Sequence, residues 1–104
     1  MRALAVFLLL IFSMQRAAAG DWRYCLAPSH EAGKVYLSLP FPVSLAAGDP
    51  ESEFGRMLER SGRPHDDVQC PRANDESAAL VMQQQAIDYN RQAGNKVVRL
   101  NWAP

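Results

Sequence analysis

Hydrophobic and polar positions alternate in two stretches of the first half of the chain. Residues 21–28 (DWRYCLAP) are rich in aromatic side chains, and residues 34–43 (KVYLSLPFPV) place an aliphatic side chain at every second position from Val35 to Leu39. A spacing of two predicts strands, and the short link between the stretches predicts a hairpin. The two prolines of the second stretch cannot donate to a sheet, so pairing should end there or the strand should lie at an edge.

A helical pattern follows in residues 49–62. Asp49 can cap the helix, and Pro50 suits its first position. Gly62 provides a stop signal at the end. An apolar stripe at helical spacing, formed by Phe54, Met57 and Leu58, should face the core.

The longest predicted helix spans residues 75–93, between a cap at Asn74 or Asp75 and a stop at Gly94. Small and apolar side chains recur along one face at helical spacing: Ala79, Met82, Ala86, Tyr89 and Ala93. We expect this stripe to pack on a sheet, with Ala86 buried at its centre. Such a stripe is more typical of core packing than of a cofactor site.

Residues 66–70 (DDVQC) and 95–104 (NKVVRLNWAP) predict two further strands. The order is then strand, strand, helix, strand, helix, strand. The simplest fold is an α+β two-layer sandwich, in which one mixed four-stranded sheet (ββαβαβ) carries both helices on one face. The strand at 66–70, the long helix and the last strand would form a right-handed βαβ crossover.

The first 19 residues have the pattern of a secretory signal peptide. Arg2 precedes an apolar run from Ala3 to Phe12, and the segment ends in three alanines before Gly20. The run is shorter than the roughly 20 residues that a membrane span needs. We therefore expect residues 1–19 to be removed and residues 20–104 to form a single small domain without a membrane span, in the periplasm or secreted.

The charge of the expected mature chain is nearly balanced. The leader contains two of the eleven basic residues, which leaves nine Lys and Arg against eleven Asp and Glu. A net charge of −2 provides no basic field for nucleic acid. We therefore expect no nucleic-acid partner, and no sequence motif indicates a cofactor.

Cys25 and Cys70 are the only cysteines of the chain. An exported chain meets an oxidising compartment, and two cysteines allow one intramolecular pairing. Closing a loop of this length would stabilise the domain by about 4 kcal/mol through the entropy of the unfolded chain. We predict that Cys25 and Cys70 form a disulfide bond.

Residues 70–102 (CPRANDESAALVMQQQAIDYNRQAGNKVVRLNW) combine a strand, a helix opened by acidic residues and alanines, a glycine, and a valine-rich strand. This pattern resembles the βαβ half of a SPOR domain, a bacterial envelope module that binds glycan strands of peptidoglycan. The resemblance covers under half of the mature chain, and the first half departs from the family's βαββαβ order. The "YC", "VYLS", later cysteine and closing "W.P" are also similar to small uncharacterised exported bacterial proteins, which implies export but no activity.

The stretch "PHDDVQC" (64–70) gathers the side chains most suited to catalysis or metal binding. On a strand, His65 and Asp67 would share a face while Asp66 points away, which gives two ligands where zinc sites use three or four. His30 could join them from the link between the first two strands. A small envelope hydrolase or metal-dependent enzyme using His65 and Asp67 is therefore the alternative to a binding protein, and it requires the two histidines to lie close together.

A sheet covered on one side would leave its other face open for a ligand. Bridged cysteines point to the same side, so alternation predicts that Cys25 faces the helices while Trp22 and Tyr24 face outward. The open face should then collect five side chains suited to sugar rings or an extended peptide: Trp22, Tyr24, Tyr36, Arg99 and Asn101. We expect a non-enzymatic binding or accessory module for an envelope ligand or protein. Association of two copies over this face is a further option.

The intact mass of protein recovered from outside the cytoplasm should correspond to a chain that starts at Gly20, because the three preceding alanines fit a cleavage site. A recovered mass that still includes residues 1–19 would contradict the signal-peptide interpretation.

Overall fold

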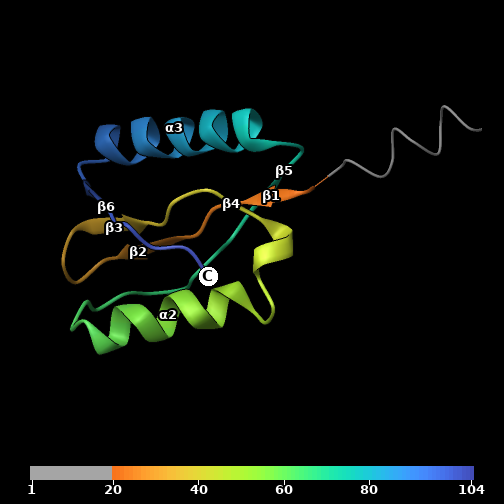
Figure 1. Cartoon of the computed structure of the whole chain (residues 1–104). Helices are drawn as coiled ribbons and strands as arrows, with labels where there is room; N and C mark the ends of the chain where they lie inside the picture. The colour runs from red at the N-terminus through yellow and green to blue at the C-terminus, as the bar shows by residue number, and fades with distance from the viewer. Residues whose placement is uncertain (1–19) are drawn as a thin grey trace, which may run out of the picture.

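The computed structural model describes residues 20–104, so the predicted signal peptide lies outside the described residues. Two α-helices and six short strands make up this part of the chain, together with one 3-10 turn (Figure 1). The elements in chain order are β1 (Trp22–Arg23), β2 (Leu26–Ser29), β3 (Lys34–Leu37), β4 (Phe41–Pro42), η1 (Val43–Leu45), α2 (Pro50–Arg60), β5 (Arg72–Ala73), α3 (Glu76–Gln92) and β6 (Lys96–Arg99). The class is α+β, as the sequence predicts.

The strands form two three-stranded sheets, so the prediction of one four-stranded sheet is wrong. One sheet has the order β4-β1-β5 and the other β2-β3-β6, with β2 and β3 antiparallel and β3 and β6 parallel. Both predicted N-terminal strands are broken in the middle. At the first break the Cys25 N–H donates to the Ser38 hydroxyl oxygen (2.8 Å) instead of to a neighbouring strand, and Pro40 in the second break has no N–H to donate.

The segment between the helices follows the outer side of β2. Gln69 forms an isolated antiparallel bridge with Leu26, and the Asp66 N–H donates to the Pro28 carbonyl. The regular strand begins later, where β5 pairs with β1. Residues 66–70 therefore lie beside the first hairpin, although they form only one bridge there instead of the predicted strand.

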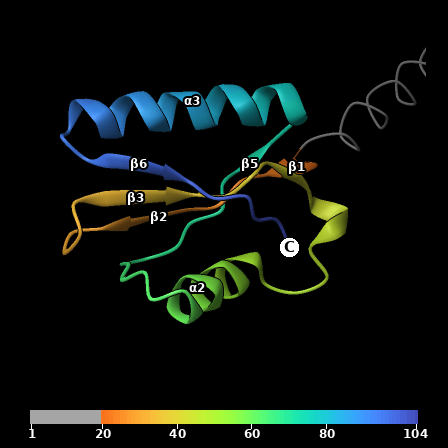
Figure 2. The ribbon, with the colours of Figure 1, turned by 60° about the vertical axis from the view of Figure 1, so that its left-hand side comes forward.

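The two helices cover opposite faces, which corrects the prediction that both lie on one face. Figures 1 and 2 show α3 on one side of the strands and α2 on the other. Two buried clusters correspond to these sides: Phe54 and Leu58 of α2 belong to one, and Ile87 of α3 belongs to the other. The reason is that β3 is apolar on both sides, with Tyr36 in the α2 cluster and Val35 in the α3 cluster.

Helix α2 begins and packs as its sequence predicts. The Asp49 carboxylate accepts from the Glu51 N–H and Pro50 occupies the first turn. The Phe54 ring lies 5.1 Å from the Trp102 ring, centroid to centroid. Val98, Leu100 and Trp102 all pack on the α2 cluster, although the regular strand ends at Arg99 instead of continuing through the predicted range.

The buried face of α3 follows the predicted stripe only at its start, where Ala79 is buried and Met82 packs on the cluster that contains Ile87. Its buried residues are Ala79, Gln83 and Ile87, whereas Tyr89 is 71% exposed and Ala86 is only half-buried. The prediction that Ala86 is buried is therefore wrong. A polar residue occupies the centre of the true face, because the Gln83 amide donates to the Ser38 carbonyl (2.7 Å) and so satisfies the buried groups of both residues.

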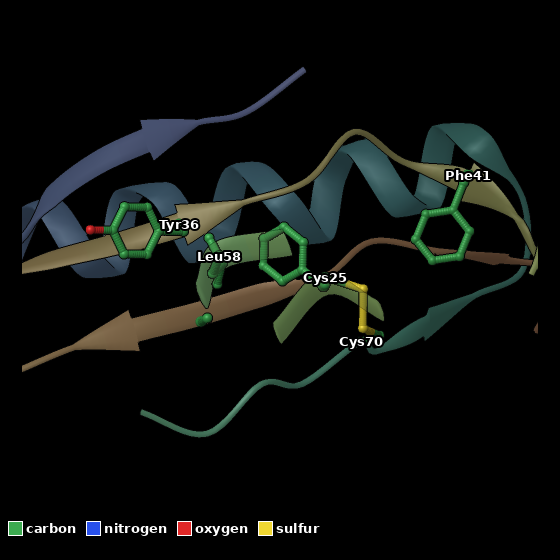
Figure 3. Close-up of a cluster of buried hydrophobic side chains, with 7 residues drawn as sticks. Cys25, Tyr36, Phe41, Leu58 and Cys70 are labelled. Atoms are coloured by element: carbon green, nitrogen blue, oxygen red, sulfur yellow. A yellow bond between two sulfur atoms is a disulfide. The ribbon is translucent and has the colours of Figure 1, made fainter. Parts of the chain in front are cut away.

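The Cys25–Cys70 disulfide is present, as predicted, and lies within the α2 cluster (Figure 3). Arg23 strengthens the same junction. Its Nε donates to the Cys70 carbonyl and its Nη2 to the Glu51 carboxylate, each at 2.8 Å. The bond and the arginine together join β1, the start of α2 and the chain that leads into β5.

We predict that removing this disulfide destabilises the domain severely. Cys25→Ala with Cys70→Ala should lower the free energy of unfolding by about 2–5 kcal/mol, as is typical of small secreted domains. Urea denaturation monitored by circular dichroism measures the change. A double variant as stable as the wild type would show that the non-covalent contacts hold this junction alone.

Candidate functional site

The structure does not bring the five predicted ligand-binding side chains onto one open face. Tyr24 and Tyr36 are each 3% exposed and belong to opposite clusters, Tyr24 on the α3 side and Tyr36 on the α2 side. Burial raises the pKa of the Tyr24 hydroxyl above its ordinary value of 10.0. Trp22 is half-buried in β1. Within residues 20–104, α2 and α3 cover the two sides of β3, and Trp22 lies in the other sheet, so the predicted open face is not formed.

Arg99 and Asn101 are exposed and lie in the same groove. The groove has a volume of about 340 Å³ and runs between α3 and the chain around the end of β6. It is lined by Ser38, Leu39, Pro40, Leu80, Gln83, Arg99, Leu100 and Asn101. We call it the α3–β6 groove.

The walls of the α3–β6 groove are held by buried hydrogen bonds. Gln83 of α3 donates to the carbonyl of Ser38, while the Ser38 hydroxyl accepts from the Cys25 N–H and donates to the Leu39 carbonyl. On the opposite side, the Leu39 N–H donates to the Trp102 carbonyl (2.9 Å) and the Leu100 N–H to the Leu37 carbonyl (2.8 Å). These contacts fix the helix, the loop after β3 and the last strand relative to one another, so the groove is largely preformed.

Two leucines give the α3–β6 groove its apolar surface. Leu39 is 43% exposed and Leu80 is 48% exposed. Leu39 therefore does not face the core with Val35 and Leu37, because the chain leaves β3 just before it. The sequence pattern does not single out either leucine as a binding residue, since an apolar residue in a predicted strand or helix is normally assigned to the core.

The histidine and aspartate residues of the predicted alternative site are divided between two hollows. His65 lines a hollow of about 470 Å³ beside the end of α2, and its Nδ1 lies 3.2 Å from the Arg63 carbonyl. Asp67 lines a different hollow of about 300 Å³ with His30 and Leu26. His30 pairs with Asp66, at 3.0 Å between Nδ1 and the carboxylate. His65 and Asp67 therefore line different hollows, and Asp66 lines both.

Within residues 20–104, no group of three or more His, Cys, Asp or Glu side chains is placed to hold a metal ion. None of the helices in the same range is long and apolar enough to cross a membrane. The chain matches no protein-family model, no curated protein and no solved structure.

The His30–Asp66 contact gives a testable pH effect. The backbone N–H and the ring of His30 both hydrogen-bond to Asp66 and hold the pKa of its carboxyl below the ordinary value of 3.8. Because this pKa is lowered in the folded state, the associated stabilisation is complete above pH 4 or so and is lost as the pH falls through the folded-state pKa.

Carboxyl-carbon NMR titration of the wild type should place the midpoint of Asp66 below 3.8, and His30→Ala should raise it. Asp49 is a suitable internal control, because Ser52 and Glu51 lower its pKa and His30 takes no part. An ordinary midpoint for Asp66 in the wild type would show that the His30 contact does not persist in solution.

Proposed function

We propose that the chain is an exported, non-enzymatic binding module of the periplasm or the secreted fraction, and that the α3–β6 groove is its ligand site. The observation that carries the proposal is the position of two exposed leucines, Leu39 and Leu80, in the same groove as Arg99 and Asn101. An apolar hollow with a few polar groups at its margin is typical of ligand sites. The expected ligand is an envelope glycan or peptide.

The exposed leucines support binding because their surface would be removed from water by a ligand. Burial of apolar surface contributes about 25 cal/mol per Å² to the free energy of transfer. Arg99 and Asn101 then supply orientation, since a guanidinium binds carboxylate groups and an amide both donates and accepts hydrogen bonds. The groove thus combines apolar surface, which contributes to affinity, with polar groups, which contribute to specificity.

The disulfide supports the proposed location outside the cytoplasm. Cys25 and Cys70 are bonded within a buried cluster, and such structural disulfides persist in oxidising compartments. A small domain of this kind commonly needs a covalent link for stability. The same disulfide therefore fits both parts of the proposal, because it suits an exported protein and stabilises the domain that carries the groove.

The alternative of a hydrolase or metal-dependent enzyme receives no comparable support. It relies on His65 and Asp67 acting together, and these residues line separate hollows. The nearest carboxylate partner of a histidine is Asp66, which is held by the exposed His30 at the surface. We therefore do not propose it.

Binding of purified mature protein to peptidoglycan fragments and to solubilised envelope proteins tests the proposed function. Leu80→Ser and Arg99→Ala should each weaken the binding by about tenfold, equivalent to about 1.4 kcal/mol, because both side chains line the groove. Two matched controls should have little effect. They are Val81→Ser, at an exposed position outside the groove lining, and Arg91→Ala, near the end of α3.

Circular dichroism and thermal melting should show that all four variants remain folded. If an envelope ligand binds and the groove variants lower its affinity no more than the control variants do, the ligand site lies elsewhere. If the mature protein binds no envelope component, the proposal of a binding module is wrong.

A further inference from the structure

Strand β6 forms the outer edge of its sheet. The order of that sheet is β2-β3-β6, and no further strand of residues 20–104 pairs with β6 (Figure 2). The Lys96 N–H donates to the Gly33 carbonyl (3.0 Å) and the Leu100 N–H to the Leu37 carbonyl (2.8 Å). Because backbone groups alternate in direction along a strand, Val97 and Arg99 turn their N–H and C=O groups away from β3.

This free edge borders the α3–β6 groove. Arg99 belongs both to the edge and to the groove lining, and Leu100 and Asn101 continue the lining beyond the strand. Leu80 and Gln83 of α3 form the facing wall. A chain that paired with β6 would therefore place its side chains on one face into the groove, while its backbone met the unpaired groups of the edge.

The edge is positively charged. Lys96 and Arg99 are exposed, and neither forms an ion pair within residues 20–104. Two copies of β6 paired along this edge would bring the Lys96 and Arg99 charges of both copies close together, and the repulsion between like charges is destabilising. Positive side chains on an edge discourage such self-pairing and favour a partner strand that carries carboxylates.

We infer that the ligand is an extended, acidic peptide that adds to β6 as a further strand. An inward-facing apolar side chain of the peptide would contact Leu80 and Leu39, and a carboxylate on the same face would bind Arg99. Side chains on one face of a strand are two residues apart, so the recognised pattern is an acidic residue two positions from a large apolar residue. This inference rests on the proposed function and specifies the ligand of the same groove.

The pattern can be tested by selecting a random library of displayed peptides, about seven residues long to match a strand, against the immobilised mature protein. The expected result is enrichment of sequences with an acidic and a large apolar residue two positions apart. Enrichment without a carboxylate, or no enrichment by a folded protein, would overturn the inference. Binding only to glycan fragments through the groove would also overturn it, while leaving the proposed function intact.

One enriched peptide, made synthetically, then tests the binding mode. Methylation of the peptide's backbone nitrogens at every second position should abolish binding when the methylated N–H groups are those that face β6. Methylation of the other alternate positions should leave the affinity nearly unchanged. Arg99→Ala should lower the affinity for the acidic peptide by about tenfold. It should change far less the affinity for a matched peptide that has glutamine in place of the acidic residue. Arg91→Ala should leave both affinities unchanged.

Equilibrium sedimentation of the free protein shows whether the β6 edge is available for a peptide or is already paired with a second copy of the chain. A monomer that binds the peptide supports the inference. A stable dimer that Arg99→Ala alters, and that excludes the peptide, would show that the edge pairs with another copy of the chain instead.

Discussion

The covalent bond between Cys25 and Cys70 fixes the contact between two segments that lie 45 residues apart in the chain. It ties the junction between β1 and β2 to the segment between the two helices, in a buried cluster that includes Phe54 and Leu58 of α2. Arg23 reinforces this junction through the Cys70 carbonyl and Glu51. In a domain with very short strands, a constraint on the unfolded chain supplies stability that a small core cannot provide alone.

The same junction is connected to the α3–β6 groove through buried hydrogen bonds. The Cys25 N–H donates to the Ser38 hydroxyl, and the Ser38 carbonyl accepts from Gln83 of α3. The bonds therefore run from the disulfide through the loop after β3 to the helix that forms one wall of the groove. Each buried polar group on this path has a partner, and an unmade bond there would cost about 1–3 kcal/mol.

The position of the helices explains why the proposed ligand site lies at an edge instead of on a sheet face. With α2 and α3 on opposite sides, the sheet presents no broad open surface (Figure 1). In the sheet β2-β3-β6, residues 66–69 lie along the β2 edge, the β6 edge is unpaired within residues 20–104, and the adjoining hollow carries exposed leucines beside Arg99. Edge strands are usually protected from non-specific pairing, and Lys96 and Arg99 provide that protection while restricting which strand can add.

Local patterns in the sequence were enough to predict the α+β class, the extent and capping of both helices, and the disulfide, because these depend on nearby residues or on a single available pairing. The arrangement of the layers could not be predicted, since β3 is apolar on both sides and alternation alone does not say which helix covers which side. Arg99 and Asn101 were recognised as binding candidates, whereas Tyr24 and Tyr36 proved to be buried. Leu39 and Leu80 were missed, and Gln83 at the centre of a buried helix face was unexpected. Only tertiary packing decides which leucines stay exposed and which polar group finds a partner inside, because both depend on contacts between residues far apart in the chain.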